Sequence, residues 1–480
     1  MGDAAGDGPG GRDRSGDGRL PGVQVGRPGL ILLVCAAAQA LGVGSASIVG
    51  VALPSIAADL GASSTAQQWI VDAYVLVFAA LLVTGGVLGD RRGRRSAFLL
   101  GLALFAAGSL VCALAPSTGV LIAGRVLQGL GSPILLPASL ALVTMANPEP
   151  AARARAIGLW SIGSGLGLTL GPVVGGALAG TLGWEWVFAF NVPVCIVLGL
   201  VATRIVPRTP AEPAREPFDA WGALGSVAAI GALVFAIIEG RSLGWSSPVI
   251  LATFATAAVA AVAWVAWEGR QASPLVDVRL FRGAAFAAAC LTATAASFAL
   301  IGVTIFFATF FQEVQGRSAL VSGLCVLPLG LGVMAAAPVA GRLAGRTGPR
   351  APLITGLVLA TAAILVLVRV EAATPSLEIW PALLLAGLGA GMALPTSTVV
   401  VVAAVAPERA GMAVAINNTL RQTGQALGVA VLGTIIFASA DGFVPGLHRA
   451  LLVAAAVTAI SASAVALLVP RGAGGAPART

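Results

Sequence analysis

A succession of long apolar stretches constrains this chain more than any other feature. The stretches follow one another from residue 30 to residue 469, and a helix of about 20 apolar residues is enough to cross a bilayer. Hydrophobic residues make up 58% of the 480 residues and charged residues only 10%, too few charges to cover a soluble protein of this size. We therefore predict an all-α polytopic membrane protein.

The apolar stretches divide into fourteen predicted transmembrane helices. They cover 30–54, 66–88, 96–114, 118–142, 156–180, 187–205, 222–239, 248–267, 286–311, 320–344, 353–370, 380–405, 412–437 and 447–469. Residues 1–28 are rich in Gly, Asp and Arg and are predicted to be a disordered tail, without the apolar core of a signal peptide. Residues 471–480 form a second predicted tail.

The arginines lie mainly in alternate loops. This set comprises Arg91–Arg95, Arg153 and Arg155, Arg204–Arg215, Arg270–Arg282 and Arg342–Arg350, together with the arginines of both tails. The positive-inside rule predicts that these loops and both termini are cytoplasmic. The net charge of +8 is spread over short loops rather than gathered on one face, which argues against a nucleic-acid partner. Arginine without lysine, beside abundant Ala and Gly, indicates a GC-rich bacterial source, so we expect a bacterial cytoplasmic membrane.

Two sequence patterns repeat at nearly the same offset. The stretch 86–95 resembles 341–350, and 167–171 resembles 424–428, so the offsets are 255 and 257 residues. They predict two duplicated bundles of six helices, 29–205 and 286–470, with a linker at 206–285 that carries the inserted seventh and eighth helices. Parallel halves with a binding site between them are a transporter architecture.

Two charged residues fall inside predicted helices of the first half. An arginine such as Arg125 costs about 2.5–3.5 kcal/mol to insert at the centre of a membrane helix, so it needs a cavity or a partner. Burial disfavours the charged form of Asp72, whereas a nearby guanidinium favours it. We interpret Asp72 and Arg125 as a proton-coupling network. The alternatives are that Arg125 only bonds backbone carbonyls and that Asp72 lies among wet headgroups.

The thirteenth predicted helix carries a second polar cluster within an apolar stretch. It consists of Asn417, Asn418, Arg421 and Gln422. We expect these residues to line a central substrate cavity with Trp69, Tyr74 and Gln128 of the first half. A purely structural role for Arg421 is the alternative.

Two glycine-containing motifs mark the first half. One is a tight loop with Gly86, Asp90, Arg91, Gly93, Arg94 and Arg95, whose glycines permit a sharp reversal and whose charges could change partners between two conformations. The other is a seam of Gly167, Gly171, Pro172, Gly175 and Gly176, where small residues permit close helix contact and proline kinks the helix. The simpler readings are a plain positive-inside loop and a packing seam.

Residues for enzyme chemistry or metal binding are sparse. The five cysteines show no short ligand spacing, His448 is the one histidine, and we find no nucleotide-binding loop. We therefore expect no enzymatic activity, no metal and no cofactor, with a proton gradient as the energy source.

These motifs resemble those of the major facilitator superfamily, in its fourteen-helix drug:proton antiporter branch. The resemblance covers about 45–470. It rests on Ala52-Leu53-Pro54, Trp69, Tyr74, the 86–95 loop, Arg125, Gln128, Gly129, the 167–176 seam, Trp184, Trp186, Phe188, Asn191, Pro193, Pro274, Leu275, Leu280 and Phe281. It implies that the seam marks an exporter, that Arg125 takes part in proton coupling and that the loop gates the conformational change. Branch members commonly carry Asp and Asn where this chain has Ser45 and Gly50, and Arg where it has Glu185. Because Ser45 lacks the usual carboxylate, more of the coupling is expected to fall on Asp72.

We expect a monomeric, proton-coupled exporter of hydrophobic or amphipathic small molecules such as antibiotics, embedded in the lipid bilayer. A membrane sensor or scaffold on the same fold, an exporter of an endogenous metabolite and a membrane-embedded enzyme are the alternatives. Retention of Arg125 and of both loops argues against the sensor, and the sparse site chemistry argues against the enzyme.

Overall fold

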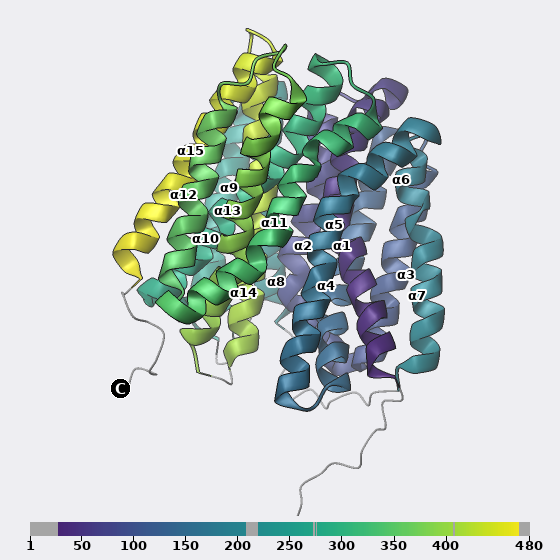
Figure 1. Ribbon diagram of the computed structural model, residues 1–480, viewed down its shortest axis with the longest axis vertical. Coiled ribbons are helices and arrows are strands. Elements are labelled where there is room, and N and C mark those ends of the chain that lie inside the picture. The colour runs from purple at the N-terminus through teal and green to yellow at the C-terminus, as the bar shows by residue number, and fades with distance from the viewer. Residues whose placement is uncertain (1–26, 208–218, 272–273, 275, 407–408, 470–480) are drawn as a thin grey trace, which may run out of the picture.

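The computed structural model is a bundle of long helices that run back and forth along one direction (Figure 1). It describes residues 27–207, 219–271, 274, 276–406 and 409–469. The predicted tails 1–28 and 471–480 therefore lie outside the described residues, except for Arg27 and Pro28. In the described part the predicted all-α architecture is confirmed.

The helices of the first half are α1 (Pro28–Leu60), α2 (Ser64–Arg92), α3 (Arg94–Ala113), α4 (Thr118–Ala146), α5 (Pro150–Thr181), α6 (Glu185–Ala189) and α7 (Asn191–Ile205). Then follow α8 (Ala220–Leu243), α9 (Pro248–Glu268) and the short 3-10 helix η1 (Val278–Arg282). The second half consists of α10 (Ala284–Thr309), the π-helix η2 (Phe310–Val314), α11 (Ala319–Thr347), α12 (Arg350–Leu367), α13 (Ser376–Ala403), α14 (Ala410–Phe437) and α15 (Phe443–Leu468).

The bundle has two distinct ends. One, called the arginine end below, holds the turn between α2 and α3, the start of α5, the end of α9 and the start of α14; α1 begins and α15 ends there (Figure 1, bottom). The other, called the far end, holds the turns between α1 and α2 and between α10 and α11. At the arginine end Gly93 adopts φ 84°, a left-handed value that favours glycine, and it is the single residue between α2 and α3.

The helices pack as two groups with a pair beside them. Within the first group α1 packs on α5, and α4 packs on α2 and α3. Within the second, α13 packs on α11 and α12, and α14 packs on α10. The pair α8 and α9 pack on each other, and α8 also contacts α2 and α14, so it touches both groups (Figure 1).

The sixth predicted helix, 187–205, is interrupted in the structure. It consists of α6 and α7, which meet at Phe190. Pro193 in the first turn of α7 has no N–H to donate to a carbonyl one turn earlier, which explains why a regular helix is not continuous here. Trp186 and Phe188, which precede this proline, lie in α6, and Asn191 is the first residue of α7.

The predicted count of fourteen membrane helices is not confirmed. Twelve spans in the described part are long and apolar enough to cross a membrane, with α6 and α7 counted as one. Helices α2 and α14, of 29 and 28 residues, are long enough but are not among the twelve. Several side chains at the end of α2 lie outside the described residues, and α14 carries four amide or guanidinium side chains between 417 and 422.

Candidate functional site

Arg125 of α4 lies fully buried in a polar cluster at the centre of the first half. Its Nε donates to the carbonyl oxygen of Ile70 in α2 at 2.8 Å. Its Nη1 donates to Ser45 Oγ of α1 at 2.9 Å and to Gln128 Oε1 at 2.8 Å. The guanidinium therefore ties three helices together and does not face lipid, which removes much of the cost of burying its charge.

Tyr74 and Gln128 complete this cluster. The guanidinium carbon of Arg125 lies 4.4 Å from the centroid of the Tyr74 ring, a cation–π geometry. The Tyr74 hydroxyl donates to the Gly42 carbonyl at 2.7 Å, and Gln128 Nε2 donates to Ser109 Oγ at 2.6 Å. Both side chains, expected to line a substrate cavity, are thus buried around the arginine.

Asp72 of α2 is also fully buried but stands apart from this cluster. No ion pair joins it to Arg125, and neither carboxylate oxygen has a hydrogen-bond partner among the described residues. It lies one helical turn after Gln68, whose amide donates to the Ala430 carbonyl of α14 at 3.2 Å. Asp72 therefore lies on the side of α2 that faces the second half. In this conformation no positive charge compensates its carboxylate.

Arg125→Lys tests the first of these two environments. Lysine keeps the charge but cannot donate in the same plane to Ile70, Ser45 and Gln128 together. Loss of a buried charged hydrogen bond costs about 1.5–3 kcal/mol, so we expect a fall in transport of about tenfold or more. Uptake into proteoliposomes measures this, with thermal unfolding to separate misfolding from lost function. Transport at the original rate would show that these contacts are dispensable.

The polar cluster of α14 lies in the second half, away from Arg125. Asn417 is buried and donates through Nδ2 to Thr398 Oγ1 at 3.1 Å and to Ser397 Oγ at 3.3 Å, both in α13. Gln422 is buried, and Asn418 and Arg421 are half-buried, with Nε of Arg421 closed to solvent and unbonded in the described part. No hydrogen bond between these four side chains and the first half is present among the described residues, so their role in a shared cavity stays a prediction.

Trp69 points to the inserted pair. Its Nε1 donates to Glu239 Oε1 of α8 at 3.0 Å, near the far end. Glu239 also accepts from Ser242 Oγ at 2.6 Å. The contact fixes α2 against α8, a function that the motif alone did not suggest.

The loop motif is described only in part. Gly86, Asp90 and Arg91 lie in α2 at positions whose side chains are outside the described residues. Beyond Gly93, Arg94 Nη1 donates to the Ala141 carbonyl of α4 at 3.5 Å, and Arg95 Nη2 donates to the Thr203 carbonyl of α7 at 2.7 Å. These bonds fasten the arginine end of α3 to its own half, and the gating role remains a prediction.

The glycine seam of α5 has two faces. On one face a Cβ at Gly167 would overlap the Ala40 carbonyl and one at Gly171 would overlap Ser47, so both glycines let α5 approach α1. On the other face a Cβ at Gly176 would overlap the Ala319 carbonyl of α11. Gly175 packs on Ile48, where a Cβ would lie 2.6 Å from the carbonyl oxygen. The seam, with buried Pro172, therefore also joins the two halves.

The two halves meet closely from the middle of the bundle to the far end. The joining contacts include Gly176 with Ala319, Gly323 with Pro172, Gly50 with Ile305, Gln68 with Ala430, and Gln312 Nε2 with the Val51 carbonyl at 2.9 Å. Where α1, α2, α10 and α14 converge, a pocket of about 10 Å³ remains, enough for about one water molecule. Among the described residues, the hydrogen bonds and close glycine contacts between the halves all lie in this region.

Comparison with known proteins decides the family. The sequence profile of the Major Facilitator Superfamily matches residues 35–429. The chain belongs to this family. It is therefore a membrane transporter and not an enzyme.

Several relatives in this family are drug-resistance proteins. The chain is 38% identical over 393 residues to the multidrug resistance protein Stp of Mycobacterium tuberculosis, which covers 82% of this chain and 73% of that protein. It is 35% identical over 395 residues to the methylenomycin A resistance protein of Streptomyces coelicolor, covering 82% and 83%. It is 36% identical over 414 residues to the tetracenomycin C resistance and export protein of Streptomyces glaucescens, covering 86% and 76%.

Solved structures of the family share the fold. A peptide transporter, POT, aligns with a TM-score of 0.68 at 17% identity, over 91% of this chain and 94% of that one. The nucleoside transporter NupG aligns with a TM-score of 0.67 at 11% identity, over 92% and 99%. The family model and the relatives confirm the resemblance to the major facilitator superfamily found in the motifs, and the prediction of a drug efflux transporter agrees with the relatives.

Proposed function

We propose that this chain exports hydrophobic or amphipathic small molecules, antibiotics among them, in exchange for protons that enter the cell. Its drug-resistance relatives in the same family, one of them also an export protein, support export. The observation that carries the mechanism is the tight closure of the halves at the far end, beside two buried charged side chains, Asp72 and Arg125, that do not pair with each other.

The orientation follows from charge. The arginine-rich loops belong on the cytoplasmic side by the positive-inside rule, which makes the far end the outer end. Closure at the far end is then the inward-facing state of an alternating-access cycle. Helices α2 and α14 lie between their apolar neighbours α4, α8 and α10, so we propose that they also cross the membrane and bring the count to fourteen.

Asp72 is the proposed proton site. A buried carboxylate without a partner is costly, and protonation removes the charge. In the outward-facing state the stripe of α2 that carries Gln68 and Asp72 separates from α14 and meets external water, where Asp72 takes up a proton. Each proton that moves inward releases about 2.3 kcal/mol per 100 mV of membrane potential. One or two protons per cycle therefore drive a modest concentration gradient. We propose a monomer without a cofactor, which binds only substrate, protons and lipid.

Drug accumulation in cells tests this function directly. We expect cells that produce the protein to hold less of a fluorescent drug such as ethidium than cells without it. A protonophore should abolish the difference, because the gradient supplies the energy. A difference that persists in the absence of any proton gradient would refute proton coupling, and no difference for a panel of such drugs would refute export.

A further inference from the structure

A cavity of about 740 Å³ lies between the inserted pair and the second half, at the arginine end. Residues of α8, α9, the segment at 276–281 and α14 line it. Its volume falls within the range of about 300–1,000 Å³ that is usual for small-molecule sites. No residue of α1–α7 contributes to the lining, so the cavity is separate from the Arg125 cluster and from Asp72.

Helix ends locate the cavity along the bundle. Gly222 is two residues from the start of α8, Glu268 ends α9, and Ile416 lies in the second turn of α14. Phe254 lies in the second turn of α9, counted from the far end, so the cavity extends from the arginine end to just past the middle of the bundle. With the orientation proposed above, most of it is at the depth of the cytoplasmic leaflet. The wall at Ile416, Thr419 and Leu420 belongs to the helix that also carries Asn417 and Arg421.

The lining is apolar and aromatic, with charge of one sign. Phe254 and Trp264 of α9 and Phe281 of η1 present rings from two elements, a surface that favours a flat aromatic ligand. Glu268 is 1% exposed and is the one charged side chain of the lining; its Oε2 accepts from the Val276 N–H at 3.2 Å. Since the lining contains no basic residue, a neutral or cationic ligand is favoured over an anion.

Two polar atoms in the walls argue against a lipid acyl chain as the intended occupant. Nε1 of Trp264 and Oγ1 of Thr419 are closed to solvent and make no hydrogen bond within the described residues. A buried polar group left unbonded costs about 1–3 kcal/mol, and a hydrocarbon chain cannot reduce that cost. A small rotation of either side chain would bring its polar atom to a ligand carbonyl or hydroxyl.

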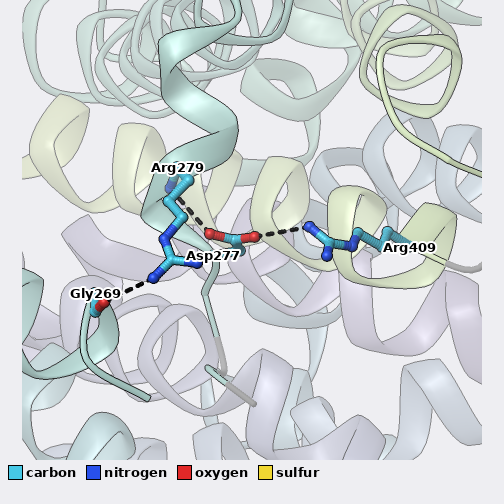
Figure 2. A network of polar contacts seen from close by, with 4 residues as sticks. All are labelled: Gly269, Asp277, Arg279 and Arg409. Atoms are coloured by element: carbon cyan, nitrogen blue, oxygen red, sulfur yellow. Dashed lines mark hydrogen bonds and ion pairs between the residues drawn. The ribbon is translucent and has the colours of Figure 1, made fainter. Parts of the chain in front are cut away.

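A polar network fixes the segment at 276–281, which forms one wall of the cavity (Figure 2). Asp277 Oδ2 accepts from Arg409 Nη1 at the start of α14 at 3.0 Å, and Asp277 Oδ1 accepts from the Arg279 N–H at 3.0 Å. Arg279 Nη2 in turn donates to the Gly269 carbonyl after α9 at 3.2 Å. The segment at 276–281 is thereby fixed between α9 and α14, and a preformed wall lowers the entropy cost of binding.

We propose that this cavity is a second binding site, for flat aromatic molecules that are neutral or cationic and carry a carbonyl or hydroxyl group. That these ligands are exported compounds, held in the cytoplasmic leaflet before transport, rests on the proposed function. The binding itself does not.

The test measures binding of Nile red, a neutral aromatic molecule with a carbonyl group, to the full chain in lipid nanodiscs without a pH gradient. Ala261 lines the cavity, whereas Ala263 two residues later is exposed and does not. We expect Ala261→Trp to weaken saturable Nile red binding about tenfold or more, about 1.4 kcal/mol, and the matched Ala263→Trp to leave it unchanged. Phe254→Leu removes a ring without filling the cavity and should weaken Nile red binding about threefold. It is the second test variant if Ala261→Trp misfolds.

Equal binding by the original chain, Ala261→Trp and Phe254→Leu would overturn the proposal and show that the cavity holds only lipid. Displacement of Nile red by the anionic dye 8-anilinonaphthalene sulfonate as readily as by ethidium would overturn the charge assignment. Because no gradient is applied, Nile red binding can succeed while cellular export fails, and the two proposals are judged separately.

Discussion

Asp72→Asn is expected to abolish pH-driven export and to leave the fold intact. Asparagine fills nearly the same volume but cannot take up and release a proton. It also removes the risk of a buried, uncompensated charge, so we expect stability to be unchanged or slightly higher. Export from proteoliposomes under an imposed pH gradient should fall to the level of vesicles without protein, while substrate binding persists.

The control for this variant is Glu239→Gln. Glu239 is an acidic residue on α8 that accepts from Trp69 at 3.0 Å, and glutamine can still accept that bond. We expect it to transport at nearly the original rate. If Asp72→Asn retained full pH-driven export, Asp72 would have no part in proton coupling.

Gly176→Ala is expected to disturb the closure of the far end. The added methyl group would overlap the Ala319 carbonyl of α11, so either the halves separate or the backbone shifts. Overpacking of this kind costs about 1–3 kcal/mol, which corresponds to roughly one to two powers of ten in the equilibrium between closed and open far end. We expect the far-end distance between spin labels at Thr181 and Val321 to increase, and transport to fall about tenfold or more.

Gly180→Ala provides the matched comparison, one turn further along the same helix. Its Cβ would lie 3.8 Å from the Leu320 nitrogen, an ordinary contact. The label distance and the transport rate should both stay near the original values. Equal effects of the two substitutions would mean that a general change in α5, and not the contact with α11, is responsible.

Hydropathy and residue spacing predicted much of the fold. Long apolar stretches predict membrane helices independently of their packing partners, because each helix forms its backbone hydrogen bonds internally in lipid. The repeated motifs predicted two duplicated halves, which stays a prediction, and the apolar surroundings of Arg125 predicted that it needs partners. The break at Phe190 was not predicted, because Pro193 interrupts the helix without changing the apolar character of the stretch. The count of fourteen spans was not confirmed, because the polar residues inside α14 lower its hydropathy without changing its place in the bundle.

The partners of the polar residues could not be predicted. Periodicity assigns Asp72 and Arg125 to membrane helices but not to faces that meet, and the structure keeps them apart. Ser45, noted as a departure from the family pattern, accepts a hydrogen bond from Arg125 at the place where a carboxylate is usual. The cavity beside α14 depends on how α8 and α9 pack against the second half. Hydropathy along the chain does not predict such tertiary packing.

One distance measurement tests the central claim that the halves rock around a shared interface. Spin labels at Thr181 and Val321 report on the far end, and labels at Arg155 of α5 and Arg346 of α11 report on the arginine end; the five native cysteines are buried and should not react. Because Asp72 can be buried at the closed far end without an uncompensated charge only when it is protonated, we expect acidification to shorten the far-end distance and to lengthen the arginine-end distance. If both distances stayed constant in preparations that still transport, the account would be contradicted.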